Sequence, residues 1–280
     1  MSGAVFTLIL LAALLSASWN ASVKGASDKY LHAVLVACGA ALLALFPLPF
    51  LSQPAPASWV YIGASALLQV IYYKLLAAAF RAGDFGHAYP LMRGTAPLLV
   101  SLVSGPVIGE ALSLGRWLGV ALICSGVIGL AWEASSRVGA NSAVMKYGLS
   151  NAVIIAAYTT VDGIGVRKSG APASYTIWIF EVSALMLVVA AMLTRRKELC
   201  SYAKGRLRSA FMGGAAVLIS YEIALWAMTQ VPIAVVAALR ETSMVFGMAI
   251  AVLILKERAG IRRYVATALI ACGALAIRLL

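Results

Sequence analysis

Apolar runs of about 20 residues follow one another along this chain, separated by short breaks that contain Gly, Pro or charged residues. A helix of about 20 residues is long enough to cross the hydrocarbon layer of a bilayer, whereas a transmembrane strand needs only about 10. Because lipid offers no hydrogen bonds to the backbone, a chain that spans it forms helices or a closed barrel. The run length therefore predicts an all-α integral membrane protein.

Reading the runs between their breaks gives ten transmembrane helices. Composition agrees, because 62% of the 280 residues are hydrophobic and 11% are charged, compared with about half and about a quarter in soluble domains. No stretch between the runs is long enough for a separate soluble domain. The predicted spans are 4–23, 31–50, 58–80, 87–109, 114–132, 147–167, 173–194, 208–229, 232–255 and 260–279.

Charge and cysteine usage exclude two other classes of protein. Lysine and arginine outnumber the acidic residues by 22 to 10. Most of them lie between the apolar runs, so no basic module for nucleic acid is formed. The four cysteines are scattered singly, without metal-binding or disulfide spacing. We therefore expect no nucleic-acid partner, no metal and no other cofactor.

The first apolar run, within 1–19, also looks like a secretory signal peptide, because Ser16-Ala17-Ser18 resembles a cleavage site. It lacks the lysine or arginine that normally precedes the apolar stretch of a signal. Its removal would also break the internal symmetry of the chain. We therefore interpret it as the first membrane helix.

The chain repeats itself without a gap, because residues 88–132 match residues 235–279 after a shift of 147 positions. Agreement among apolar residues arises easily by chance, whereas agreement among charged residues does not. The charged pairs that the shift superimposes are Arg93 with Arg240, Glu110 with Glu257, and Arg116 with Arg263.

Two halves of five helices follow from this repeat, and an odd number of helices inverts the second half in the membrane. We predict one five-helix repeat over 1–134 and a second over 147–280. Inverted repeats are an architecture of secondary transporters, which bind their solutes at the repeat interface.

Each half resembles an EamA domain of the drug/metabolite transporter (DMT) superfamily, and the resemblance covers nearly the whole chain. It is carried by a helix followed by Gly109-Glu110 or Lys256-Glu257, and by a glycine-bearing last helix in each half. Residues 89–98 are similar to a bacterial branch that includes membrane proteins associated with phosphonate use.

The resemblance implies export of amino acids, drugs or other metabolites by alternating access from the cell inner (plasma) membrane. The first helix departs from the family pattern, because Trp19 is followed directly by Asn20 where small residues usually intervene.

Six ionisable side chains lie well inside the predicted spans, away from their ends, where charge is costly and is by default a mark of function. They cluster at two depths in helices that the repeat relates, so we predict that they converge on one polar cavity between the halves. Asp162 lies near a helix end, and we interpret it as a loop or snorkelling residue. The six are Lys74, Arg93, Glu181, Glu222, Arg240 and Glu241.

The residue types suit a zwitterionic or amino-acid-like solute. A carboxylate beside an indole attracts an organic ammonium group, and basic side chains bind a carboxylate or phosphonate. The predicted substrate-binding residues are Lys74, Arg93, Arg240, Tyr73, Trp178, Trp226 and Asn20. The predicted proton carriers are Glu181, Glu222 and Glu241.

A second interpretation of the same charges stays open, in which they neutralise one another as structural pairs. Lys74 or Arg93 would then pair with a neighbouring acid, and Arg240 with Glu222. For Glu110, at a helix end near Arg116, a solvated ion pair is the ordinary explanation; the same holds for Glu257, near Arg258, Arg262 and Arg263.

The fourth span, 87–109, is predicted to be the breakable and moving element, because it contains three prolines and two glycines. Packing around small residues is the alternative explanation. The repeat-related span 232–255 has no proline inside it. The residues concerned are Pro90, Pro97, Pro106, Gly94 and Gly105.

Three functions are weighed against one another. The first is a secondary transporter, an exporter driven by proton antiport, because no GxxxxGK[ST] loop for ATP is present. The second is a membrane-embedded enzyme, but no metal cluster or nucleophile–base pair is found. The third is a channel or a non-transporting partner, which inverted halves argue against. The sequence does not define the oligomeric state.

Orientation follows from the basic residues, which are enriched in cytoplasmic loops. Loops and ends on the side of the termini carry four, whereas the opposite loops carry fifteen. The resemblance to EamA transporters implies cytoplasmic termini instead. Since charge acts directly on insertion, we predict that both termini face the periplasm or exterior and that the loop at 195–208 is cytoplasmic.

Overall fold

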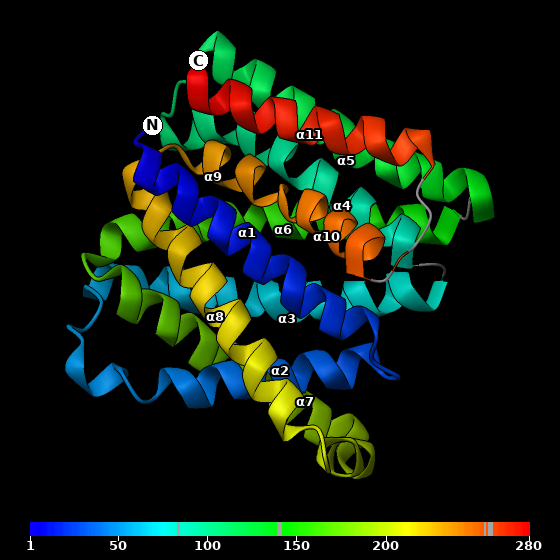
Figure 1. The fold of residues 1–280 in the computed structure, drawn as a ribbon. Helices are drawn as coiled ribbons and strands as arrows, with labels where there is room; N and C mark the ends of the chain where they lie inside the picture. The colour runs from blue at the N-terminus through cyan, green and yellow to red at the C-terminus, as the bar shows by residue number, and fades with distance from the viewer. Residues whose placement is uncertain (83–84, 139–141, 255, 257–259) are drawn as a thin grey trace.

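The computed structural model describes residues 1–82, 85–138, 142–254, 256 and 260–280, and the regular elements of this part are all helical. The helices form one bundle whose N- and C-termini lie at the same end (Figure 1). The predicted all-α fold of ten helices is confirmed when α9 and α10, which share one predicted span, are counted together. Seven of the described helices are long and apolar enough to cross a membrane, and α2 is a shorter apolar helix.

The first half begins with α1 and ends with α5, and each helix follows one apolar run. Its helices are α1 (Gly3–Lys24), α2 (Lys29–Ala44), α3 (Trp59–Ala82), α4 (Phe85–Val103) and α5 (Leu114–Val138). Its short helical turns are η1 (Leu48–Phe50), η2 (Pro56–Ser58) and η3 (Ser104–Ile108).

The second half repeats this order and also contains a short turn before its last helix. Its helices are α6 (Ser142–Ser169), α7 (Pro172–Ala203), α8 (Leu207–Gln230), α9 (Ile233–Arg240), α10 (Ser243–Ala249) and α11 (Ile261–Leu279). The turn is η4 (Ile250–Ile254). Both η3 and η4 are π-helical, so the wider turn recurs at nearly equivalent places in the two halves.

Several predicted spans differ from the helices in their bounds, and two of them differ most. The second span was expected to reach residue 50, but α2 ends at Ala44, because Pro47 and Pro49 follow and cannot continue the hydrogen-bonded helix. The ninth span was expected to be continuous, but it divides between Arg240 and Ser243.

The division of the ninth span is a tightly wound turn rather than a loop. The amide of Glu241 donates to the carbonyl of Ala238, and that of Thr242 to the carbonyl of Leu239, which is 3₁₀ rather than α spacing. The Thr242 hydroxyl also donates to the Leu239 carbonyl, at 2.7 Å. Polar side chains that bond locally in this way compete with the α-helical pattern.

The fourth span, which was predicted to be breakable, is α-helical through Pro90 and Pro97 and changes to a π-helical turn at Ser104. Its role as the moving element stays a prediction. Helix α4 also packs closely against α5. A Cβ atom added at Gly94 would lie 3.0 Å from Cγ1 of Val127, so α4 approaches α5 as closely as a glycine permits. Small-residue packing, the alternative explanation for these glycines, describes this contact.

The two halves meet most closely where α5 packs against α11, side by side at one edge of the bundle (Figure 1). A Cβ atom added at Gly119 would lie 2.8 Å from the carbonyl oxygen of Gly273. One added at Gly126 would lie 2.5 Å from that of Ala266. Glycines therefore let the two backbones touch, as in other membrane helix pairs.

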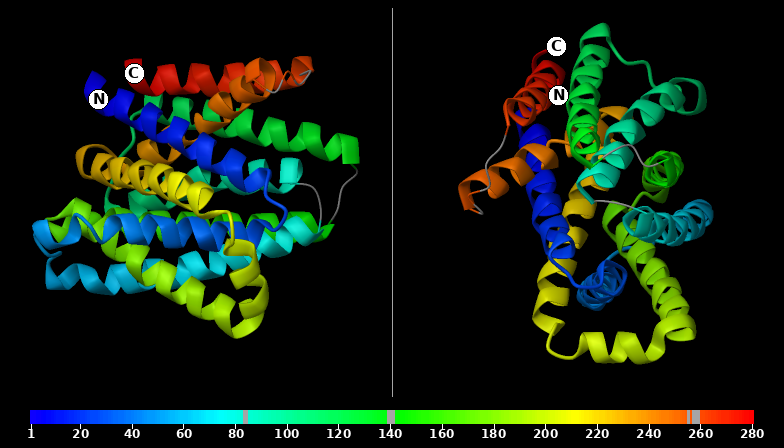
Figure 2. Two further views of the ribbon diagram at one scale, coloured as in Figure 1. Left: turned by 60° about the horizontal axis from the view of Figure 1, so that its bottom comes forward. Right: turned by 90° about the vertical axis from the view of Figure 1, so that its right-hand side faces the viewer.

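Helix α7 bends at Arg195, whose backbone angles (φ −141°, ψ 37°) are not helical. The bend falls at the predicted end of the seventh span. Beyond it, the last part of α7 runs across the end of the bundle before α8 begins (Figure 2, right). This basic segment was predicted as a loop and is helical as far as Ala203.

Candidate functional site

A polar cavity lies in the middle of the bundle, between helices of both halves. One part has a volume of about 60 Å³ and an adjoining part about 20 Å³, so the enclosed space holds a few waters. Arg93, Tyr158 and Arg240 line both parts. The other polar and aromatic lining residues are Ser16, Trp19, Asn20, Gln69, Tyr72, Tyr73, Thr159, Phe180, Ser220, Tyr221 and Glu241.

A two-pronged ion pair joins the halves at this cavity. Arg93 on α4 places Nε 3.0 Å from Oε2 of Glu241 and Nη2 2.9 Å from Oε1. Both side chains are nearly buried, with exposed fractions of 12% and 5%. The Nε contact is a charge-assisted hydrogen bond, which is stronger than a hydrogen bond between neutral groups, and the Nη2 contact adds an ion pair to it. This pairing agrees with the interpretation of Arg93 as the partner of a neighbouring acid.

Arg240 precedes Glu241 in sequence but is held differently. Its guanidinium carbon lies 5.2 Å from the centre of the Tyr221 ring, a cation–π contact. Its Nε is buried and has no hydrogen-bond partner among the described residues. The expected pair between Arg240 and Glu222 is not among the ion pairs of the described residues. Arg240 therefore keeps a donor available for a ligand.

Asp162 corrects an expectation, because it is neither a loop nor a snorkelling residue. Helix α6 continues to Ser169, so Asp162 lies two turns inside it and is completely buried. The hydroxyl of Tyr221 donates to its Oδ2. Tyr221 thus contacts Asp162 with its hydroxyl and Arg240 with its ring.

Aromatic rings form much of the remaining wall. The ring of Tyr72 lies 5.0 Å from that of Tyr73 and 6.0 Å from that of Tyr158. The rings of Phe180 and Tyr221 lie 5.8 Å apart and nearly perpendicular. Such a wall accepts apolar and cationic groups, whereas the arginines accept anionic groups.

Half of the predicted site residues line this cavity and half do not. Those that line it are Asn20, Tyr73, Arg93, Arg240 and Glu241. Those that are not among its lining residues are Lys74, Trp178, Trp226, Glu181 and Glu222.

Lys74 was predicted to lie in the cavity, but it is exposed on the outside of α3. Successive helical residues are turned by about 100° from each other. Since Tyr72 and Tyr73 take the inward positions, Lys74 is directed away from the cavity.

Trp178 and Trp226 are partly buried against the apolar core rather than the cavity. Trp178 lies near the end of the bundle that carries the termini, where its ring is 5.0 Å from that of Trp59. Its Nε1 donates to Oε1 of Gln53 at 3.0 Å. This is the ordinary position of a tryptophan at a membrane interface.

Glu181 and Glu222 lie on the neighbouring helices α7 and α8 and are partly buried. The Thr176 hydroxyl faces Glu222. Oε1 of Glu181 has no hydrogen-bond partner among the described residues. Neither glutamate is among the lining residues of the central cavity, and their proton role stays a prediction.

The end of the bundle that carries the termini is closed by Glu110. Its two oxygens accept the backbone N–H of Ile233, the first residue of α9, at 2.9 and 3.2 Å, and it also pairs with Arg167. Arg167 in turn donates to the carbonyls of Met228 and Val231. Glu110 is therefore a buried link between the halves, not the solvated pair with Arg116 that was expected. Glu257, its counterpart, lies outside the described residues.

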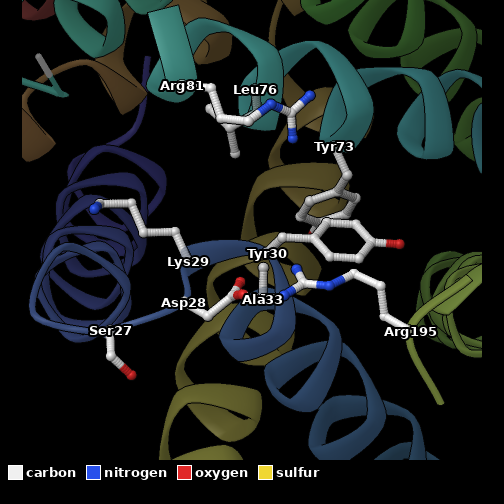
Figure 3. A pocket seen from close by; sticks show the side chains of 9 residues that line it. All are labelled: Ser27, Asp28, Lys29, Tyr30, Ala33, Tyr73, Leu76, Arg81 and Arg195. Atoms are coloured by element: carbon white, nitrogen blue, oxygen red, sulfur yellow. Dashed lines mark ion pairs between the residues drawn. The ribbon is translucent and has the colours of Figure 1, made fainter. Parts of the chain in front are cut away.

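The opposite end holds a wider cavity of about 500 Å³, which we call the vestibule. Figure 3 shows its side chains: Arg81, Leu76 and Tyr73 from α3 face Asp28, Lys29 and Tyr30 at the start of α2, with Arg195 beside them. Since Tyr73 also lines the central cavity, it separates the two spaces. The bundle is thus open towards the basic end and closed towards the termini.

Asp28 organises one wall of the vestibule. It accepts the Leu31 amide at 3.0 Å as the N-cap of α2 and pairs with Arg195 at 2.7 Å. Burial opposes its charge, but the Leu31 amide and the Arg195 guanidinium outweigh it and hold the pKa of Asp28 below its usual value. Because this pKa is lowered on folding, the contacts stabilise the protein near neutral pH and are lost as pH falls through it.

Sequence reasoning missed Asp162 and Tyr221. Their spacing carries no signal, because 59 residues separate them and only the packing of α6 against α8 brings them together. The predicted sixth span ends at 167, whereas α6 continues to Ser169, so Asp162 lies deeper in the helix than predicted.

An all-helical bundle in two related halves, with a charged cavity between them, defines a membrane protein of the transporter class. The chain belongs to the EamA-like transporter family of the DMT superfamily, which it matches twice, over residues 3–132 and 143–279. Membership places it among membrane transporters.

A solved structure described as "Crystal structure of protein" shares the fold, with a TM-score of 0.72 over 98% of this chain and 96% of that chain. The two are 20% identical in sequence, so the likeness concerns the fold alone. No curated protein matches the chain.

Proposed function

We propose that the protein is a secondary active transporter that exports a small zwitterionic or amino-acid-like metabolite by alternating access, with coupling to protons. The observation that carries this proposal is Arg240, a partly buried cation whose buried Nε has no hydrogen-bond partner among the described residues, in an aromatic cavity between the halves. Repeats 1–134 and 147–280 are the proposed moving bodies.

The two ends of the bundle support alternating access. The link from Glu110 to Ile233 and Arg167 closes one end, whereas the vestibule opens the other. Transport requires this closure to break while the vestibule closes, so a channel open at both ends is the alternative to exclude. The central cavity of about 60 Å³ must also widen, because it holds only a few waters.

Binding is tested by a thermal-shift screen of the purified protein against amino acids, aminophosphonates and other zwitterions. A ligand at 100 times its Kd adds about 2.7 kcal/mol to stability. A compound that stabilises the protein but not Arg240→Gln supports the proposed site. Equal stabilisation of both proteins places the binding site elsewhere.

Transport is tested by counterflow in proteoliposomes that contain the compound found in this screen. A carrier accumulates labelled solute against unlabelled internal solute, whereas a channel only equilibrates it. Chemical conversion of the solute by the protein would favour the enzyme alternative.

Orientation is tested with Cys200, which is exposed on the segment after the α7 bend. The other three cysteines are replaced, and a second variant carries Ser2→Cys in place of Cys200. We expect an impermeant thiol reagent to label position 2 in intact cells and Cys200 only after lysis. The reverse pattern would show that the termini are cytoplasmic, and the vestibule exterior.

A further inference from the structure

Asp162 is the deepest carboxyl group of the described chain that the proposed mechanism has not used. Its exposed fraction is 0%, and among the described residues Oδ1 meets no hydrogen-bond donor at bonding geometry. The described residues also contain no ion pair to it. A carboxylate buried without a paired cation is expensive, and protonation removes that cost.

The groups around Asp162 come from each helix that packs against α6 at this depth. Ser65 on α3, Tyr175 on α7 and Tyr221 on α8 face it with hydroxyls, and Tyr158 lies one turn away on α6 itself. Arg240 on α9 is the cation whose charge interacts with the Asp162 carboxylate, and its guanidinium group lies over the ring of Tyr221. Arg93 on α4 is already paired with Glu241.

We propose that Asp162 is a proton-binding site and that Tyr221 connects it to Arg240 in the solute cavity. The site differs from the three glutamates considered from the sequence. Tyr221 is suited to this link, because its hydroxyl donates to the charged carboxylate and can accept from the protonated one. Its use in transport rests on the proposed function, whereas proton binding itself does not.

The position of Arg240 sets the sign of the coupling. Its positive charge supports the Asp162 carboxylate, and a solute anion bound to Arg240 neutralises that charge. Solute binding therefore favours proton binding, and by reciprocity proton binding favours the solute. An exporter with this coupling moves the solute and the proton outwards together, driven by a high internal concentration of the solute. Antiport would instead require the solute and the proton to compete for binding.

Infrared spectroscopy of the purified full chain tests the site with the proton as the only ligand. As pH is lowered, the carbonyl band of a protonated carboxylic acid should appear, and Asp162→Asn should remove it. Glu181→Gln and Glu222→Gln are matched controls and should retain it. A titrating band that persists in Asp162→Asn and disappears in Glu222→Gln would overturn the proposal.

Two further variants test the connection. Arg240→Gln imitates neutralisation by a bound anion and should move the titration of this band to higher pH. Should Asp162→Asn fail to fold, Asp162→Glu serves instead, because it keeps a carboxyl group but moves the frequency of its band. An unchanged titration in Arg240→Gln contradicts the connection between Asp162 and Arg240. An unchanged band frequency in Asp162→Glu contradicts Asp162 as the proton-binding site. Since no solute is added, a failure to find a transported solute leaves these results unaffected.

Discussion

Helix α4 and the α9–α10 segment are related by the shift of 147 residues, yet they differ in the middle of the membrane. Both pass through a π-helical turn and stop at a left-handed residue, Gly109 (φ 75°) or Lys256 (φ 55°). Between these common features, α4 is continuous, whereas the second segment is divided at Glu241. The repeats thus share their ends and diverge at the cavity.

The difference is concentrated at one pair of equivalent positions, Gly94 and Glu241. Gly94 permits the approach of α5, and Glu241 pairs with Arg93. The repeat-related arginines consequently have different surroundings: Arg93 has a carboxylate partner, and Arg240 has a ring and a free donor. An inverted repeat can in this way supply two equivalent cations, one with an ion-pair partner and the other with a donor that is unpartnered among the described residues.

The largest expected effect comes from breaking the Arg93–Glu241 pair. Glu241→Gln leaves Arg93 as a buried charge without a counterion and should lower the free energy of unfolding by about 3–5 kcal/mol. Replacing both partners by apolar residues, Arg93→Met with Glu241→Leu, should cost less than the single change. Reversible unfolding in mixed micelles measures both. A loss below about 1 kcal/mol for Glu241→Gln would contradict a buried structural pair.

Arg240 should affect solute binding more than stability. Arg240→Gln removes a charged hydrogen bond worth about 1.5–3 kcal/mol, which is roughly a 10- to 150-fold loss of affinity for the anionic group. Arg240→Lys should recover only part of it, because an ammonium group lacks the planar fork. Titration calorimetry with the solute found by the screen measures these changes.

Lys74→Gln is the matched control for Arg240→Gln. It removes a cation that the sequence placed in the same cavity but that the structure places on the outside of α3. Its affinity for the solute should equal that of the wild type. A comparable loss in both variants would show that the solute site extends beyond the described cavity.

The sequence predicted the number and order of the helices because hydropathy and bilayer thickness act on each helix separately. It also predicted that Arg93 and Arg240 lie at one cavity between the halves, since charge matched across a repeat is rarely accidental. Their role in binding a solute stays a prediction. The sequence failed for Lys74, because depth along a helix says nothing about which side faces inward. It failed for Asp162, because its contact with Tyr221 depends on the packing of α6 against α8. It failed for the break at Glu241, because hydropathy does not report the local 3₁₀ hydrogen bonds that form there.

The smallest expected effect concerns the shared stop at the end of each segment. A left-handed backbone costs a non-glycine residue about 1–2 kcal/mol. Glycine avoids this cost but loses about 0.5–1 kcal/mol through its greater freedom in the unfolded chain. Gly109→Ala should therefore destabilise the protein by about 1 kcal/mol, and Lys256→Gly should stabilise it by somewhat less.

These two substitutions form a matched test of the repeat. Lys256 is exposed, and a Cβ atom added at Gly109 meets nothing within 4 Å, so packing contributes little to either change. Unfolding in mixed micelles should show opposite signs for the two variants, with additivity in the double variant because the sites lie in separate halves. If both substitutions destabilise the protein, the Lys256 side chain makes stabilising interactions of its own. The left-handed residues that end the two segments would then have different causes in the two halves.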